Sequence, residues 1–305
     1  MKFELTILGC GGAIPTLDKN PTSQYLNIQD RHFLIDCGEG TQIQLRKFKC
    51  KFSKIDHVFI SHLHGDHFLG IFGYLSTLSL LGRTNTLNIY APKDLESLIE
   101  AHNEISGKKY NFNLNFISLD FKKSTKLFED NVLEVFSFPV NHSVECCGFL
   151  FREKTSKRKI IKDEIKNLGL GIEDIKKLKN SEDCVLNGVT VKYEDVTTLG
   201  KKSRSYAYCA DTKYDEKIIQ HIKNVDLLYH ESTFLEELKS KATKTKHSTA
   251  IQAAKIALLA DVENLIIGHF SARYDNFDLF KEQASKIFKN TTAAYDGYTF
   301  QIKNL

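Results

Sequence analysis

The sequence lacks any apolar run long enough to act as a signal peptide or to span a membrane as a helix. Residues 1–8 alternate apolar with polar side chains, as a strand does. The longest candidate segment, residues 68–81, is short for a bilayer and is interrupted by Ser76, Thr77 and Ser79. We therefore expect a cytoplasmic protein with no membrane partner.

The sequence also lacks a Cys-x-x-Cys pair, although it contains seven cysteines. Cys146 adjoins Cys147, where an ordinary disulfide would be strained. The odd number and the spacing predict reduced thiols that pack as small buried hydrophobic side chains, in preference to metal ligands or redox groups.

Low-complexity tracts, proline-rich linkers and strong short repeats are absent, which favours a single domain over residues 1–305. The exception is the region of about residues 150–185. Its segment 152–180 holds ten Lys or Arg against five Asp or Glu, whereas the rest of the chain is close to neutral. This clustering predicts an inserted basic arm that contacts a polyanion, with a merely solvated surface arm as the alternative.

Short apolar segments alternate with helical stretches, which is typical of an α/β protein. A helix is expected over residues 249–259, beginning at His247 or Ser248, because apolar residues there recur at helical spacing. Strands are expected at residues 5–8, 32–35, 58–60, 87–90, 132–138, 206–209, 227–229 and 265–267.

The strongest chemical signal directly follows the predicted strand at residues 55–60. There His62, His64, Asp66 and His67 stand within six residues, in the pattern H-x-H-x-D-H. Imidazole and carboxylate groups this close suit zinc, and a site without cysteine is typical of catalytic zinc, which keeps water among its ligands. The alternative is a histidine-rich loop that binds nothing, which the density of the motif disfavours.

Three further candidate ligands, His142, Asp211 and His269, each come just after a predicted strand, so they can converge at one edge of a sheet. H-x-H-x-D-H followed by a lone His, a lone Asp and a lone His resembles the ligand order of the metallo-β-lactamase superfamily. The resemblance implies a four-layer αββα sandwich that holds two Zn²⁺ ions. It assigns His62, His64 and His142 to one ion, Asp66, His67 and His269 to the other, and Asp211 as the bridge between them.

Other segments resemble one branch of that superfamily, the ribonuclease Z family. They are residues 8–16, 20–23, 33–42, 229–234, 246–250, 253–254 and 268–274. This resemblance implies a zinc-dependent endoribonuclease that removes the 3′ trailer from tRNA precursors, leaving a tRNA 3′-OH and a 5′-phosphorylated trailer. It also implies a homodimer in which the arm of one subunit serves the active site of the other.

A second constellation combines His247 with Glu231, because a carboxylate can orient and charge an imidazole that reaches a phosphate. In the resembled family this pair assists the leaving group, and Asp66 orients and deprotonates the nucleophile. The alternative is that His247 caps a helix and Glu231 is a buried structural acid.

The resemblance makes residues 150–185 an exosite for the tRNA body, where basic side chains neutralise phosphates without reading sequence. The candidates are Lys154, Lys157, Arg158, Lys159, Lys162, Lys176, Lys177 and Lys179. The loop after Pro15 is expected to contact the tRNA 3′ end through Lys19, where the family usually has arginine. The arm also lacks the family's Gly-Pro pair at residues 168–173.

Two other functions share these features. A small-molecule phosphodiesterase, arylsulfatase or lactonase of the same fold would have the same metal ligands but no need of a basic arm. A catalytically silent RNA-binding protein would keep the fold, yet every ligand position in this sequence is filled.

Overall fold

The computed structural model describes residues 2–107, 109–166 and 168–303 and divides the chain into two compact units. The first unit comprises Met1–Arg152 and Ser205–Ile302, and the second contains Glu153–Arg204. Within the described residues, no helix has the length and apolar character needed to cross a membrane.

Two seven-stranded sheets form the centre of the first unit. The first sheet has the spatial order β20 (Thr299–Gln301), β1 (Phe3–Gly9), β3 (Ser23–Ile28), β4 (Arg31–Cys37), β5 (Ile55–Phe59), β6 (Leu87–Ala91), β7 (Leu114–Ser118). The second has the order β19 (Thr291–Ala293), β17 (Asn264–Gly268), β16 (Leu227–Glu231), β15 (Ser205–Cys209), β10 (Cys147–Glu153), β9 (Leu133–Pro139), β8 (Thr125–Glu129). A small parallel ladder joins β2 (Gly11–Gly12) to β18 (Phe270–Ser271).

Alternation along the strands divides the apolar side chains between two cores. On β4, Phe33 and Ile35 point into the core between the sheets, whereas Leu34 belongs to the core under the outer helices. Phe59 of β5 meets Phe149 of β10 across the inner core, with ring centroids 5.3 Å apart. Each sheet therefore buries both faces.

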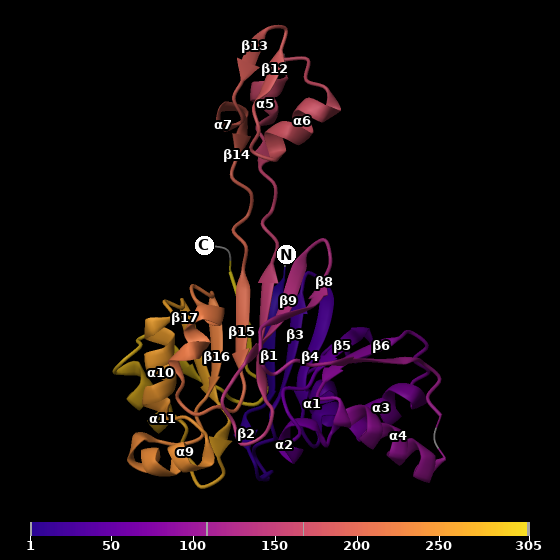
Figure 1. The fold of residues 1–305 in the computed structure, drawn as a ribbon, viewed down its shortest axis with the longest axis vertical. Coiled ribbons are helices and arrows are strands. Elements are labelled where there is room, and N and C mark those ends of the chain that lie inside the picture. Colours follow the sequence, from indigo (N-terminus) through magenta and orange to yellow (C-terminus); the bar gives the residue numbers. More distant parts are fainter. Residues whose placement is uncertain (1, 108, 167, 304–305) are drawn as a thin grey trace. The chain divides into compact units, whose positions relative to one another are not determined.

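Helices cover the outer face of each sheet (Figure 1). The first sheet carries α1 (Thr41–Lys47), α3 (Ile71–Leu80) and α4 (Asp94–Ser106), and the second carries α10 (Ala250–Leu259) and α11 (Asp278–Ser285). The remaining elements are short: η1 (Phe52–Lys54), α2 (Gly65–Phe68), η2 (Glu216–Ile218), α8 (Ile219–Ile222), η3 (Glu236–Leu238) and α9 (Lys239–Thr245). The predicted αββα sandwich is confirmed.

The predicted strands all overlap observed strands, and the predicted helix at 249–259 is α10. Its N-cap is Thr249, one residue beyond the expected Ser248. The Thr249 hydroxyl accepts a hydrogen bond from the Gln252 amide, and the Gln252 side chain accepts one from the Thr249 amide. This reciprocal capping box fixes where the helix begins.

The second unit, here called the arm, overlaps the segment of about residues 150–185 that the sequence singles out and continues to Arg204. The chain after β12 (Cys184–Leu186) returns through β13 (Val189–Val191), α7 (Tyr193–Val196) and β14 (Thr197–Thr198). β14 pairs with β11 (Lys159–Ile160), and α5 (Lys162–Ile165) and α6 (Ile172–Lys179) complete the unit. Leu178, Cys184 and Val196 form its small core. The basic segment 152–180 stops before these returning elements, so composition alone does not mark where the unit ends.

Candidate functional site

The sequence-predicted ligands lie at the carboxyl ends of strands in the first unit. The motif from His62 to His67 follows β5, Asp211 follows β15 and His269 follows β17. The strands β15, β16 and β17 are parallel and in register, with Glu231 opposite Gly268, so their ends meet at one edge. The structure brings all seven predicted ligands together there.

One group consists of His62, His64, His142 and Asp211, whose candidate ligand atoms lie within 4.8 Å of one another. The Nδ1 atom of His64 is 3.1 Å from Nε2 of His62 and 3.1 Å from Nε2 of His142. His62 and His142 are buried, and burial lowers the pKa of both. They are therefore held in the neutral form that binds metal ions.

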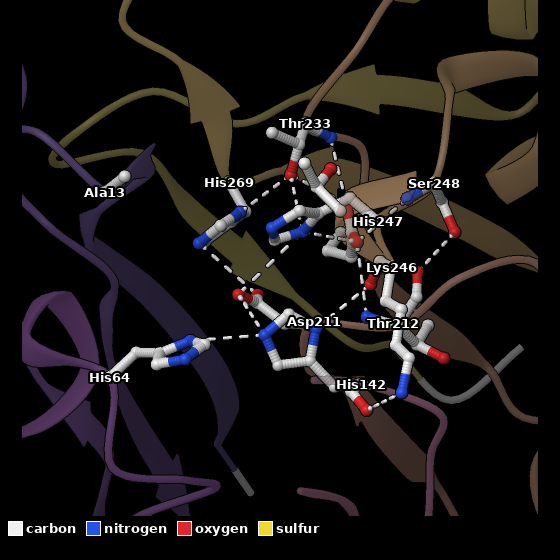
Figure 2. A network of polar contacts seen from close by, with 12 residues as sticks. Ala13, His64, His142, Asp211, Thr212, Thr233, Lys246, His247, Ser248 and His269 are labelled. Atoms are coloured by element: carbon white, nitrogen blue, oxygen red, sulfur yellow. Dashed lines mark hydrogen bonds and ion pairs between the residues drawn. The ribbon is translucent and has the colours of Figure 1, made fainter. Parts of the chain in front are cut away.

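A second group consists of Asp66, His67 and His269, and a third combines Asp211 and His269 with His247. The Nε2 atoms of His67 and His269 are 3.2 Å apart, and the Asp66 carboxylate is 3.2 Å from Nε2 of His269. Asp211 faces both the first and the second group: its Oδ2 atom is 3.5 Å from His67 and 3.8 Å from His142, and its Oδ1 atom is 3.3 Å from His269. Figure 2 shows this carboxylate between His269 and His142.

The first group fits a cation because hydrogen bonds at Nδ1 fix the orientation of two of its imidazole rings. His142 Nδ1 donates to the Lys246 carbonyl at 3.0 Å, and His62 Nδ1 lies 3.0 Å from the Ser61 hydroxyl. With Nδ1 engaged in this way, the Nε2 lone pair of each ring points into the cluster.

The second group is supported in the same manner. His67 Nδ1 donates to Asp36 at 2.7 Å, and His269 Nδ1 lies 2.9 Å from the Thr233 hydroxyl. Burial lowers the pKa of His67, but the carboxylates of Asp211, Asp66 and Asp36 outweigh that effect and raise it above its ordinary value. The buried site thus carries an excess of negative charge that a metal ion would neutralise.

His247 and Glu231 also meet, with the imidazole Nδ1 2.9 Å from the Glu231 carboxylate. Glu231 is buried and accepts further hydrogen bonds from the backbone amides of Thr212, Thr233 and Ser248. Burial lowers the pKa of His247, but Glu231 more than compensates and raises it to about 9. The His247 ring stacks on His269 at 5.4 Å, so this pair borders the metal-ligand groups.

The residues predicted to contact RNA differ in whether they already have partners within the protein. Lys19 donates to the Tyr274 carbonyl at 3.0 Å and lies 3.8 Å from the Phe277 ring centroid, so it already has partners within the protein. In the arm, Arg158 donates to Thr197 and stacks over Tyr193, which makes it part of the arm's own framework. Of the remaining predicted contacts in the arm, Lys154 is half-buried, and the exposed ones are Lys157, Lys159, Lys162, Lys176, Lys177 and Lys179.

Sequence reasoning missed three residues that hold the site in place: Asp36, Thr233 and Lys246. Asp36 is the second-last residue of strand β4, at the same edge as the candidate ligands, and this placement is a signal that could have identified it. Thr233 contacts Glu231, His247 and His269 together. Lys246 contributes its backbone carbonyl, which no residue-type pattern reveals.

Comparisons with known proteins agree with this geometry. A ribonuclease Z from Bacteroides thetaiotaomicron is 42% identical over 304 residues, covering 99% of this chain and 96% of that protein. A ribonuclease Z from Cytophaga hutchinsonii is 42% identical, with 100% and 97% covered. The crystal structure of human tRNase Z, short form, has a TM-score of 0.71 and 26% identity, covering 98% of this chain and 99% of that one.

A family model described as Anti-Pycsar protein Apyc1 matches residues 3–161, just over half of the chain. That match contains His62 to His142 but ends before Asp211, Glu231, His247 and His269, which the full-length relatives do cover. The chain belongs to the ribonuclease Z family and, through the match over its first half, also to the family described as Anti-Pycsar protein Apyc1.

Proposed function

We propose that the protein is a zinc-dependent endoribonuclease that removes the 3′ trailer from tRNA precursors, leaving a tRNA 3′-OH and a 5′-phosphorylated trailer. The single observation that carries this proposal is the convergence of seven candidate ligand residues with the His247–Glu231 pair in a member of the ribonuclease Z family. A small-molecule phosphodiesterase of this fold shares the metal ligands, so substrate tests must include one.

Two zinc ions are proposed at this site: His62, His64 and His142 would hold one, Asp66, His67 and His269 would hold the other, and Asp211 faces both sets of residues. The nitrogen and oxygen donors and the absence of cysteine from these groups suit zinc. When bound, zinc supplies a water-derived nucleophile at neutral pH and offsets charge on the phosphoryl group.

Three side chains have proposed roles in the reaction. Asp66, held by the Ala13 amide at 2.6 Å and by His269, orients the attacking water and accepts its proton. His247 donates a proton to the departing ribose 3′-oxygen. Glu231 touches no substrate and acts by fixing the His247 ring, since their hydrogen bond leaves Nε2 as the free nitrogen. Among the described residues, His247 Nε2 has no hydrogen-bond partner.

The arm is the proposed exosite for the tRNA body. The six exposed lysines among the predicted contacts lie on a unit with its own small core and provide positive charge that contacts phosphates without depending on base sequence. We also propose that the protein is cytoplasmic and that it is a homodimer in which the arm of each subunit serves the other.

The test is incubation of the zinc-loaded protein with a 3′-extended precursor tRNA, with product ends mapped at nucleotide resolution. A single cut near the discriminator nucleotide, leaving a 3′-OH and a 5′-phosphate, is expected. Hydrolysis of a small phosphodiester without cleavage of the precursor would instead assign the site to a small-molecule phosphodiesterase.

A further inference from the structure

A cavity of about 520 Å³ adjoins the metal-ligand groups on the side of His142. It is formed by the loop between β7 and β8, the end of β9 and the segment leading into α8. Its charged lining residues are Lys122, Lys123, Lys217 and Asp215, alongside His142 and His221. Three lysines against one aspartate make this a positively charged cavity that opens beside a metal ligand.

The lysines of this cavity are available to a ligand. Lys122 and Lys217 are exposed, and neither side chain has an ion-pair partner among the described residues. Lys123 has only a loose contact with Asp120, at 3.8 Å. Asp215 is occupied, since its carboxylate accepts the backbone amide of Lys217 at 3.0 Å and caps η2. Free ammonium groups gathered around a cavity favour an anion.

A second cavity, of about 410 Å³, adjoins the same centre on the side of His247 and His269. Ala13, Phe234 and Arg273 also line it, whereas Lys122, Lys123 and Lys217 do not. His142 lines the first cavity and His247 the second, and the centroids of these two rings are 5.0 Å apart, so the cavities open at neighbouring positions around the centre. The centre therefore has a His247 side and a lysine side.

This arrangement assigns a direction to the RNA. In the proposed reaction His247 protonates the 3′-oxygen that leaves with the tRNA, so the last nucleotide of the tRNA lies on the His247 side. The RNA beyond the scissile phosphate is attached through a different phosphate oxygen, and the lysine cavity offers it a path away from the centre. Each nucleotide of that single strand brings one phosphodiester charge, which is the group that lysines neutralise.

We propose that the cavity of Lys122, Lys123 and Lys217 binds the backbone phosphates of the single-stranded 3′ trailer, a role separate from that of the basic arm. This inference rests on the proposed function, because it uses the polarity that His247 imposes on the cleaved bond. The bound group is a phosphodiester backbone, so the contacts select for trailer length and not for trailer sequence.

The test compares two precursors, one with a trailer of a single nucleotide and one with a trailer of about twelve nucleotides, long enough to span a single-strand site. The variant carries Lys122→Gln and Lys217→Gln, which remove charge but keep much of the side-chain length. The control carries Lys223→Gln and Lys289→Gln. These exposed lysines precede β16 and β19, at the strand starts, away from the ends that bear Glu231 and His269.

We expect the cavity variant to lower kcat/KM for the long-trailer precursor by about 5- to 10-fold at physiological salt. The slope of log kcat/KM against log salt concentration should become shallower by about 1.4, as for two lost contacts to single-strand phosphates. Cleavage of the single-nucleotide precursor should match the wild type. Equal effects on both precursors, or an equal effect of the control variant, would overturn the proposal. If the wild-type protein cuts neither precursor, the proposed function itself fails. That result differs from the two outcomes above, in which the wild-type protein is active and only the trailer-binding proposal fails.

Discussion

At the scale of single residues, the site depends on hydrogen bonds behind the ligands as well as on the ligands themselves. Asp36 is the clearest example. It is buried and accepts hydrogen bonds from His67 Nδ1, from the amide and hydroxyl of Ser61, and from Tyr208. Because one carboxylate holds the ring and the start of the ligand loop together, it aligns the second metal-ligand group.

Asp36→Asn tests this role without straining the backbone. Asp36 has φ of 53°, a conformation that asparagine also tolerates. An amide cannot accept at both positions, so its NH₂ group must face either the Ser61 amide or the donors on the other oxygen. We expect metal affinity to fall by about 10- to 100-fold, measured by competition with a chelator.

The matched control is Asp56→Asn, which removes a carboxylate at the other end of β5, where Asp56 pairs with Arg83. It should leave metal affinity unchanged. Wild-type affinity in the Asp36 variant would show that the His67 ring is oriented by its surroundings without this carboxylate.

His247 allows a separation of chemistry from metal binding. His247→Asn removes the proposed proton donor but none of the residues assigned to the metal ions. We expect kcat for precursor cleavage to fall by about 10²- to 10³-fold, as for loss of a general acid, while bound metal per protein stays at the wild-type level. His102→Asn, on α4 beside Phe72, is the control and should change neither quantity. Loss of metal in the His247 variant would place this residue among the ligands instead.

At the scale of elements, the short ladder between β2 and β18 sets how closely the chain approaches His269. Gly12 pairs with Ser271, and a Cβ atom built at Gly12 would lie 2.6 Å from Cε1 of the His269 ring. That distance is well below van der Waals contact, and the Thr233 hydroxyl holds the ring in place at Nδ1. Glycine is therefore required at this position because a larger residue would collide with the His269 ring, and not because of the strand's backbone conformation.

Gly12→Ala is expected to displace His269, lower metal content and reduce cleavage, with the fold retained. Gly11→Ala is the neighbouring control, because a Cβ there meets the Asn20 carbonyl oxygen at 3.3 Å, which a small shift relieves. Circular dichroism and metal analysis on both variants distinguish the outcomes. Full metal content in the Gly12 variant would contradict the proposed steric role.

The elements, and the convergence of the candidate ligands at one sheet edge, were predictable from sequence because each depends on local order. Period-two alternation identified the strands. Asp211 and His269 were identified by their positions just after strands, and His62, His64, Asp66 and His67 by the density of the H-x-H-x-D-H motif. The backbone carbonyl of Lys246 and the hydroxyl of Thr233 were not predictable, since their contacts join segments far apart in the chain. The pairing of β11 with β14 was missed for the same reason, and with it the end of the arm.

At the scale of the whole molecule, the two units allow RNA binding to be separated from bond cleavage. The arm leaves the second sheet between β10 and β15, which are antiparallel neighbours with Arg152 opposite Ser205. Just beyond this pair, the Glu153 amide donates to the Arg204 carbonyl at 2.8 Å, and the two side chains form a buried ion pair. The strands are thus already in register for a hairpin.

Replacing residues 154–203 with Asn-Gly should close that hairpin, because a two-residue type I′ turn suits directly paired strand ends. We expect the shortened protein to keep its metal ions and to hydrolyse a small phosphodiester near the wild-type rate. Precursor cleavage should fall by about two orders of magnitude or more, the scale expected when several phosphate contacts are lost. Equal loss of both activities would contradict the division of roles.

A second variant separates the charge of the arm from its presence. It keeps the arm and changes to glutamine six of its exposed lysines, the predicted contacts Lys157, Lys159, Lys162, Lys176, Lys177 and Lys179. If phosphate contacts are the arm's contribution, this variant should weaken precursor binding uniformly across tRNA sequences and flatten the salt dependence, while the small-substrate rate stays unchanged. A variant that binds precursor with the wild-type salt dependence would show that the arm acts through its shape, for instance in pairing subunits, and not through its charge.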